Sequence, residues 1–441
     1  MSACMQNGHS VELPREWRRD KIARSCDFIG SGGTPSTGNP DFYDGDIPWV
    51  QTGDLDDEWL DETAKTITEE GLRHSAARLY SRNTLLVAMY GATIGKLGIL
   101  KFSAAVNQAC CALIVRKTMD MKFMFYTLRS LRADLIAKAL GGGQQNIGQE
   151  TIKQTYINYP PLPEQQRIAA YLDASCAAID AAAAAKRRQL KILDALRKTI
   201  IHNATTKGIN SHAKNKQLRS EMFDSIPAHW NVDRFKDVAL LRNEKTDQAS
   251  EAEDYLELED MESGTGQILS RRNTLEVESA VTLFEKGDIL FGKLRPYLQK
   301  YYEAEFDGKC TGEILAFKPI RIRGRFLFYC IASPWFINRC NILAYGAKMP
   351  RINWPTQLAQ FDLPLPPIEE QDAICAFLDS KLDKIKDIRR GIENQIATLT
   401  AYRKSLIHEC VTGQRRVTEA DVQRARQSSP TRLEHSTEDM T

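Results

Sequence analysis

The segment of this chain that comes nearest to a nucleotide-binding motif is residues 91–97 (GATIGKL). A phosphate-binding P-loop needs four residues between its glycines, and a Ser or Thr after the lysine to hold magnesium. Here the interval is one residue short, and Leu97 stands where the hydroxyl is needed. The chain has no G-x-G-x-x-G and no G-x-S-x-G, and residues 158–161 (NYPP) hold the letters of an amino-methyltransferase motif in the wrong order. These patterns argue against a catalytic chain.

Metal and thiol chemistry is also weakly supported. The acidic cluster Asp54, Asp56, Asp57 and Glu58 lacks the D-x-D-x-D-G spacing and the closing Glu of a calcium loop, so we interpret it as an acidic surface loop. The ten cysteines are scattered without a C-x-x-C pair. This favours reduced, idle thiols over disulfides or a zinc site, and with it a cytoplasmic location.

Two pairs of loops carry side chains suited to nucleic acid. Arg and Lys can bind phosphates or guanine edges, and Gln and Asn can bind adenine edges. For each residue the alternative, a solvated loop position, stays open. The candidate DNA-binding residues are Tyr90, Thr93, Lys96, Gln144, Gln145 and Asn146 in the first half, and Lys293, Arg295, Tyr297, Lys348, Arg351 and Asn353 in the second.

An internal repeat organises the elements that must position these loops. Residues 160–168 (PPLPEQQRI) return at 366–374 (PPIEEQDAI), and the offset of 206 residues holds without a gap for over forty positions. Each copy opens a stretch rich in alanine, leucine and basic residues and free of further proline, which predicts a long helix. A helix of about 44 residues would be about 65 Å long, too long for one small domain.

Alternating steps of four and three residues predict an apolar seam on each helix. The first series is Ile168, Leu172, Ser175, Ile179, Ala182, Lys186, Gln189, Leu193, Leu196 and Ile200; the second is Ile374, Leu378, Lys381, Ile385, Ile388, Ile392, Gln395, Leu399, Tyr402 and Leu406. If these seams bury each other the helices run antiparallel, because the second returns along the first. The predicted fold class is therefore α+β: two globular domains joined by two long antiparallel coiled-coil helices, with a pseudo-two-fold internal repeat.

Composition agrees with a soluble protein of more than one domain. The chain has 441 residues and a net charge of +2, which excludes a globally basic protein and leaves room for local basic surfaces. No apolar run approaches the ~18–20 residues of a membrane span, and the start lacks the apolar core of a secretory signal. We expect a flexible tail at 1–13, globular domains at 14–159 and 227–365, helices at 160–207 and 366–412, a linker at 208–226, and a polar, disordered tail at 413–441.

In this order the motifs resemble those of the specificity subunits of type I restriction-modification systems. The doubled Pro-Pro segments with Glu164-Gln165 and Glu370-Gln371 carry most of the resemblance. Weaker matches are residues 33–36 (GTPS), 45–50 (GDIPWV), 52–55 (TGDL), 90–96 (YGATIGK), 107–109 (NQA) and 226–230 (IPAHW).

The resemblance implies a non-catalytic chain in which residues 14–159 and 227–365 are target-recognition domains. Each would read one half of a bipartite, asymmetric site in double-stranded DNA, and the helices would set the unread gap. The helices would also dock two methyltransferase subunits that bring S-adenosylmethionine, and motor-nuclease subunits would supply ATP and Mg chemistry. The second half lacks a clear match to residues 90–96, which suggests that the two domains read different sequences.

Two other functions stay open. A fused methyltransferase or nuclease would need a cofactor motif that the sequence does not show. A structural coiled-coil adaptor whose globular domains bind proteins rather than DNA would need none, and only a binding experiment separates it from a DNA-binding chain.

Overall fold

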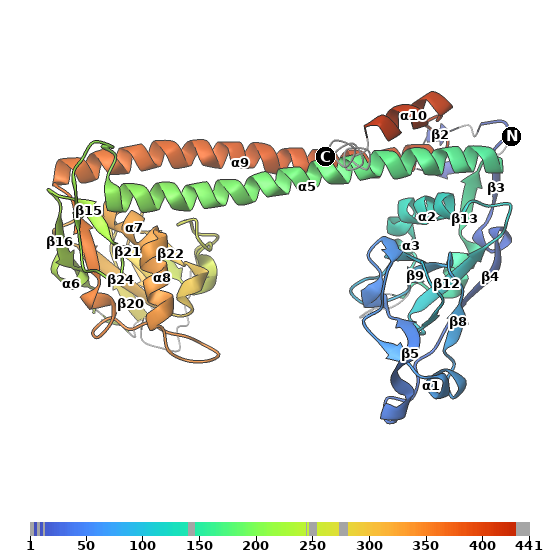
Figure 1. The fold of residues 1–441 in the computed structure, drawn as a ribbon, viewed down its shortest axis with the longest axis horizontal. Coiled ribbons are helices and arrows are strands. Elements are labelled where there is room, and N and C mark those ends of the chain that lie inside the picture. Colours follow the sequence, from blue (N-terminus) through green and yellow to red (C-terminus); the bar gives the residue numbers. More distant parts are fainter. Residues whose placement is uncertain are drawn as a thin grey trace, which may run out of the picture. The chain divides into compact units, whose positions relative to one another are not determined.

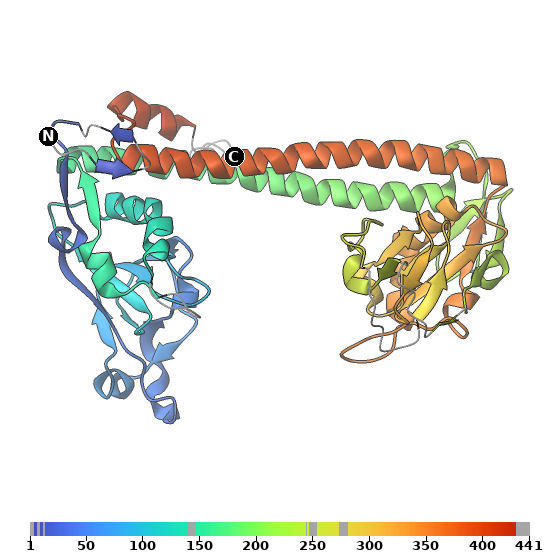
Figure 2. The ribbon, with the colours of Figure 1, turned by 180° about the vertical axis from the view of Figure 1, so that it is seen from behind.

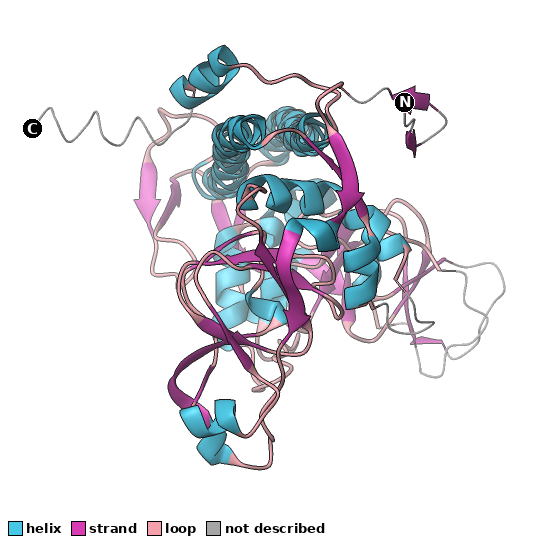
Figure 3. Ribbon diagram, turned by 90° about the vertical axis from the view of Figure 1, so that its right-hand side faces the viewer, coloured by secondary structure: helices cyan, strands magenta, loops and turns pink. Residues whose placement is uncertain are grey.

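The computed structural model describes residues 4–6, 9–11, 14–139, 146–243, 245–246, 254–272 and 281–428. The chain divides into two compact units, residues 1–186 with 394–441, and residues 187–393 (Figure 1). Each unit holds one globular part, which we call a head, at residues 18–159 in the first unit and 231–365 in the second. In each head strands are mixed with short helices (Figure 3), and each unit also contains about half of each of two long helices. The α+β class with an internal repeat is thereby confirmed.

The first head contains two β-sheets with short helices, and large apolar side chains such as Trp49 and Phe123 fill its cores. One sheet has the order β4-β12-β9-β10-β6 and the other β7-β5-β11-β8. The strands are β4 (Cys26–Ser31), β5 (Tyr43–Val50), β6 (Glu58–Leu60), β7 (Thr66–Ile67), β8 (Arg78–Tyr80), β9 (Leu85–Ala88), β10 (Leu97–Leu100), β11 (Ala104–Val106) and β12 (Cys110–Val115), and the helices are α1 (Glu69–Arg73), α2 (Met121–Ser130), α3 (Arg132–Ala137) and α4 (Gln149–Gln154).

The second head repeats this plan of sheets and short helices (Figure 2). In its aromatic core Phe235, Phe317 and Phe336 pack together. Its sheets have the orders β17-β24-β21-β22 and β18-β20-β23-β19. The strands are β17 (Ala239–Leu241), β18 (Lys245–Thr246), β19 (Asp254–Leu256), β20 (Val281–Phe284), β21 (Ile289–Gly292), β22 (Tyr301–Glu303), β23 (Gly308–Cys310) and β24 (Ile314–Pro319), and the helices are α6 (Phe235–Val238), α7 (Gly324–Ala332) and α8 (Pro334–Leu343).

The heads share a core and differ at its edges. In both, the second sheet is built on one parallel and one antiparallel pair, β5-β11-β8 in the first head and β19-β23-β20 in the second. The fourth strand of this sheet is added on different sides in the two heads. In the first head β7 pairs with β5, the parallel partner of the central strand, whereas in the second head β18 pairs with β20, the antiparallel partner. These edges are therefore where the repeat has diverged.

The long helices are α5 (Leu162–Lys207) and α9 (Ile368–Val411). In the first unit Asp180 of α5 pairs with Arg403 of α9 at 2.8 Å, and Tyr171 lies under Arg415, just beyond α9. In the second unit Asp194 pairs with Arg389 at 2.5 Å, and a Cβ on Gly208, just beyond α5, would lie 3.2 Å from the side chain of Glu370 on α9. Within each unit, partners on α9 descend in number as those on α5 rise, so the predicted antiparallel pairing is confirmed.

The predicted seam is right in part. Ile168, Leu172 and Ile179 on α5, and Ile385, Ile392 and Leu406 on α9, are buried as expected.

Several other predicted seam positions, on both helices, are wrong. Leu196, Ile388 and Tyr402 are 45%, 53% and 49% exposed, and Gln189, Gln395 and Lys381 are exposed too. After Leu378 the seam of α9 includes Leu382 rather than Lys381 and continues through Arg389, Ile396 and Arg403, all four of which are half-buried. The two arginines lie on the seam because Asp194 and Asp180 of α5 pair with them.

Each head meets its long helix at a two-stranded ribbon. β13 (Tyr156–Tyr159) pairs with β3 (Arg18–Lys21), and β25 (Asp362–Leu365) pairs with β16 (Asn231–Arg234). The Pro-Pro pair follows directly and ends each ribbon, because proline cannot donate to a ladder.

The segments predicted to be unstructured contain regular elements. The polar tail after residue 413 holds α10 (Glu419–Gln427), because Thr418 and Asp421 form a capping box and Val417 and Val422 are buried. The predicted linker holds β14 (Asn215–Gln217), which pairs with β15 (Ser225–Pro227). β1 (Cys4–Gln6) and β2 (His9–Val11) pair within the predicted N-terminal tail.

One helix, α5, is long and apolar enough by composition to cross a membrane, contrary to the expectation from the sequence. Its alanine-rich middle accounts for this apolar composition, and Asp173 and Asp180 of the helix pair with Lys122 and Arg403. The ion pairs indicate that this helix packs against protein.

Candidate nucleic-acid interface

The P-loop-like segment of the first head is a tight turn between β9 and β10. The Ile94 amide donates to the Gly91 carbonyl at 3.2 Å, and the Gly95 amide donates to the Ala88 carbonyl at 2.8 Å. A strand follows the turn where a P-loop would need a helix. The backbone and the missing hydroxyl at Leu97 therefore both indicate that this segment is not a P-loop.

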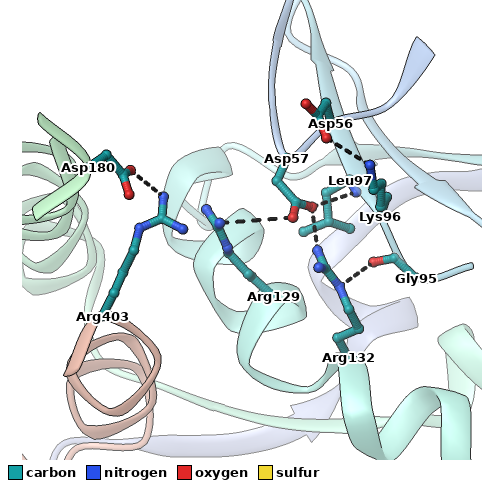
Figure 4. A network of polar contacts seen from close by, with 9 residues as sticks. All are labelled: Asp56, Asp57, Gly95, Lys96, Leu97, Arg129, Arg132, Asp180 and Arg403. Carbon is teal, nitrogen blue, oxygen red and sulfur yellow. Dashed lines mark hydrogen bonds and ion pairs between the residues drawn. The ribbon is translucent and has the colours of Figure 1, made fainter. Parts of the chain in front are cut away.

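Arg132 of α3 holds this turn from beneath. Its Nε donates to the Gly95 carbonyl at 2.8 Å, and its guanidinium pairs with Asp57 (Figure 4). The approach is so close that a Cβ on Gly95 would lie 2.9 Å from the Arg132 side chain, and Gly95 has a φ of +75°. Glycine is therefore required at this position for both reasons.

Asp57 is the centre of a group of polar contacts that links the turn to α2 and α3 (Figure 4). Its Oδ1 accepts from the Leu97 amide at 3.0 Å, and its Oδ2 lies 3.9 Å from Arg129 of α2. Burial alone would raise the pKa of Asp57, but hydrogen bonding to Arg132 and the charges of Arg132 and Arg129 lower it. The interpretation of Asp57 as a surface residue is wrong, since its side chain is only 14% exposed.

The next charge beyond Arg129 is also positive. Burial and the nearby Arg403 both lower the pKa of Arg129. Arg403 in turn pairs with Asp180. The Asp57 ion pairs thus run from the turn to α3 and α2, and the separate Asp180–Arg403 pair joins α5 to α9 beside them.

The second candidate loop of the first head meets this turn. Tyr90 and Asn146 form an isolated antiparallel bridge, and the Ile147 amide donates to the Met89 carbonyl at 2.8 Å. Lys96 pairs with Asp56 at 2.7 Å, so part of its charge is already neutralised. Gln144 and Gln145 lie outside the described residues.

The second head brings its two candidate loops together at the corresponding place. Leu294 and Arg351 form an isolated antiparallel bridge, and the Ile352 amide donates to the Lys293 carbonyl at 3.0 Å. Both bridges lie directly after a central strand, β9 in one head and β21 in the other. Sequence identity between the two heads is too low in these loops to show that the bridges correspond, whereas the backbone pairing shows it.

Arg295 adopts the left-handed conformation with a φ of +50°, which costs a non-glycine residue on the order of 1 kcal/mol. Its amide donates to the Pro350 carbonyl at 2.7 Å and its guanidinium to the Lys348 carbonyl at 3.3 Å. These bonds hold the strained residue beside the 3-10 turn Pro296–Leu298, where Tyr297 is 51% exposed. Strain of this kind concentrates at functional sites.

The other candidates in this head differ in availability. Lys348 is exposed, whereas Arg351 makes a two-fold ion pair with Glu313 at 3.1 and 3.2 Å. The Asn353 side chain accepts from the amide and hydroxyl of Thr356, so it caps a turn. Asn353 is thus the weakest candidate in the second head.

Sequence reasoning missed one aromatic residue of this surface. Tyr345 is 61% exposed, and its backbone exchanges hydrogen bonds of 3.0 and 2.9 Å with Arg351. Hydropathy gave no signal for it, because an exposed tyrosine and a buried one look alike in a sequence. The candidate surface of the second head therefore presents basic and aromatic groups together, a combination that suits nucleic-acid binding.

The heads, their repeated loops and their shared helices place the chain in a known class. The model of the family described as type I restriction modification DNA specificity domain matches residues 14–192 and 227–398, and the chain belongs to this family.

Individual relatives agree in length. The chain is 24% identical over 427 residues to the type I restriction enzyme MjaVIII specificity subunit of Methanocaldococcus jannaschii, covering 93% of this chain and 95% of that one. It is 24% identical over 391 residues to the EcoDI specificity subunit of Escherichia coli, covering 84% and 87%.

Two solved structures share the fold. A chain from a study of assembly and conformational transition of the type I R-M system is 16% identical, with a TM-score of 0.72 over 92% of this chain and 100% of that one. The HsdS subunit of Thermoanaerobacter tengcongensis is 16% identical, with a TM-score of 0.52 over 92% and 99%. At this identity the likeness concerns the fold alone.

The ion network predicts a large effect of one charge. We expect Asp57→Asn to lower the free energy of unfolding by about 2–3 kcal/mol at pH 7, because it leaves Arg132 and Arg129 without their carboxylate. Asparagine tolerates the left-handed φ of +64° at this position, so the variant tests the charge rather than the backbone. Urea unfolding of the full chain measures the loss.

Asp56→Asn is the matched control, because Asp56 is 85% exposed and its pair with Lys96 should contribute less than about 1 kcal/mol. The lowered pKa of Asp57 means that its contribution is present above the unfolded pKa of about 3.9 and is lost as pH falls below it. The difference between wild type and Asp57→Asn should therefore shrink towards pH 3. Equal losses for both variants at pH 7 would contradict the network.

Proposed function

We propose that this chain is the DNA sequence-specificity subunit of a type I restriction-modification complex. Each head reads one half of a bipartite, asymmetric site, and the paired helices set the unread gap. The observation that carries the proposal is the repeated loop bridge, Tyr90 with Asn146 and Leu294 with Arg351, on two heads with the same sheet core. A duplicated reading surface suits a ligand with two half-sites.

The two surfaces differ in chemistry, which supports an asymmetric site. The first is a glycine turn whose Lys96 is paired with Asp56. The second carries Arg295 and Tyr297 on a strained turn beside Lys348. Side chains with different donors and different reach favour different base edges.

Catalysis belongs in this proposal to partner subunits, as the naming of the relatives as specificity subunits supports. Methyltransferase subunits would bring S-adenosylmethionine, and motor-nuclease subunits would bring ATP and Mg, in the cytoplasm. At the level of the Asp194–Arg389 ion pair, Ile192 and Leu196 of α5 and Ile388 of α9 are exposed. Exposed aliphatic side chains on a polar helix pair suit a docking surface for a methyltransferase subunit.

Mapping of genomic methylation in cells with and without this chain tests the function. We expect a two-part motif that is methylated only when the chain is present together with its methyltransferase subunit. Retardation of duplex DNA by the purified complex should show the same motif. Methylation by the chain alone with added S-adenosylmethionine would overturn the proposal in favour of an enzyme, and failure to bind any duplex would favour a protein-binding adaptor.

Docking is tested by Ile192→Glu and Ile388→Glu. We expect each to weaken binding of the methyltransferase subunit by about 10- to 100-fold, because each places a charge in an apolar contact. Ile320→Glu is the control, since Ile320 is similarly exposed but lies on the second head. Titration calorimetry with the purified methyltransferase subunit gives the affinities, and equal weakening by the control would place docking elsewhere.

A further inference from the structure

Each joint between a head and its long helix contains a completely buried glutamine. Gln165 and Gln371 stand at equivalent positions of the repeat, and both are 0% exposed. A buried amide costs stability unless its hydrogen bonds are made, and a satisfied one fixes a single geometry. The partners of these amides therefore show what the joint holds in place.

In the first unit Gln165 joins the start of one helix to the start of another. Its Oε1 accepts from the amide of Asp120, the N-cap of α2, at 2.8 Å. Its Nε2 donates to the carbonyl of Pro160, just before α5, at 2.8 Å. One side chain thus ties the head to the first turn of its long helix.

The second unit repeats both bonds. The Oε1 of Gln371 accepts from the amide of Arg323, the N-cap of α7, at 2.8 Å, and its Nε2 donates to the carbonyl of Pro366 at 2.9 Å. The two N-cap residues differ in charge, so the repeated feature is the backbone geometry.

A second attachment lies eight residues further along each long helix. In the first unit Asp173 accepts from the Tyr126 hydroxyl at 2.9 Å and pairs with Lys122, both on α2. In the second unit Asp379 accepts from the hydroxyl of Tyr329 and pairs with Arg325 at 2.5 Å, both on α7.

Eight residues are about two helical turns, or about 12 Å, so the amide and the carboxylate face the same side of the long helix. A single contact would let the head rotate about it, whereas two contacts along the helix fix the orientation of the head relative to the helix axis. The pair of contacts therefore sets the angle at which each head is held on its helix.

We propose that Gln165 with Asp173, and Gln371 with Asp379, are positioning residues that determine how strictly the gap between the half-sites is read. This inference rests on the proposed function. The length of the helices would set the preferred gap, and the joints would set the penalty for a gap that is one base pair too short or too long. The bases of each half-site would not depend on the joints, because no described joint residue belongs to the candidate reading loops.

The test uses the full chain in complex with its methyltransferase subunits. The substrates are duplexes with both half-sites at the native gap and at gaps one base pair shorter and longer, and the readout is the methylation rate. We expect Gln165→Met and Gln371→Met each to raise the rate at the altered gaps, relative to the native gap, by about tenfold, because methionine keeps the volume and removes both hydrogen bonds. Discrimination against base changes in either half-site should stay as in wild type.

Gln189→Met and Gln395→Met are matched controls, since these glutamines are also equivalent in the repeat but are exposed. Tyr126→Phe and Tyr329→Phe give a milder second test that removes a single hydroxyl, with an expected rise of about two- to threefold. If a glutamine variant does not fold, these tyrosine variants test whether the joint controls the gap preference. An unchanged gap preference in folded variants, an equal change in the controls, or an altered half-site would each overturn the inference.

Failure of the proposed function gives a different result. In that case the wild-type complex would show no preference for any two-part site, at any gap. The wild-type reaction at the native gap therefore separates the two.

Discussion

A shortened helix pair should recognise a shortened site. Deletion of residues 181–187 from α5 together with residues 396–402 from α9 is expected to shorten the preferred gap by about three base pairs. Seven residues of helix rise about 10 Å, and duplex DNA rises 3.4 Å per base pair. Both half-sites should keep their bases, because the deletion touches neither head.

The structure indicates that these two seven-residue deletions keep the helix pairing. The deleted stretches lie between the Asp180–Arg403 and Asp194–Arg389 ion pairs, so both pairs remain. Seven residues are one repeat of the seam, so Ile392 is then followed by Arg403 as it was by Ile396, and the buried stripe continues. Deletion of four residues would rotate the stripe off its partner and serves as the control for loss of pairing.

Methylation mapping in cells that carry the deletion variant and the methyltransferase subunit measures both parts of the site at once. The same half-sites at the original gap would remove the spacer role from the helices. A change in the bases of either half-site would also count against it, because it would mean that the helices shape the reading surfaces.

The sequence predicted those features that depend on local pattern. The repeat at Gln165 and Gln371 and the helical composition after each Pro-Pro pair were sufficient for the two long helices. Antiparallel pairing followed from connectivity alone. The seam register failed because α9 offers apolar residues on two faces, so that Ile388 and Ile396 are equally good candidates until their partners are known.

The interface was predictable only in outline. Residues 90–96 and 293–297 were recognisable as loops, but contacts such as that of Tyr90 with Asn146 depend on strand pairing across the head. The role of Asp57 was hidden because its partners Arg132 and Arg129 are more than seventy residues away in sequence. Charge pairs of this kind leave no periodic signal.

Exchange of the heads should change the site one half at a time. Replacement of residues 18–159, from the first residue of β3 to the last of β13, by the head of a relative with a known site is expected to replace one half-site. The other half-site and the gap should remain. Each head can be exchanged in this way because its first and last strands pair with each other and close it at the joint.

A stricter version places a second copy of the first head, residues 18–159, in place of residues 231–365. We expect the repeated joint to accept it, because Asp120 and Tyr126 of the graft would replace Arg323 and Tyr329 as partners of Gln371 and Asp379. Since the helices pair antiparallel, the two identical heads would read the same bases in inverted orientation. Methylation mapping should then show a palindromic two-part motif, and a direct repeat or an unchanged asymmetric site would contradict the inverted arrangement.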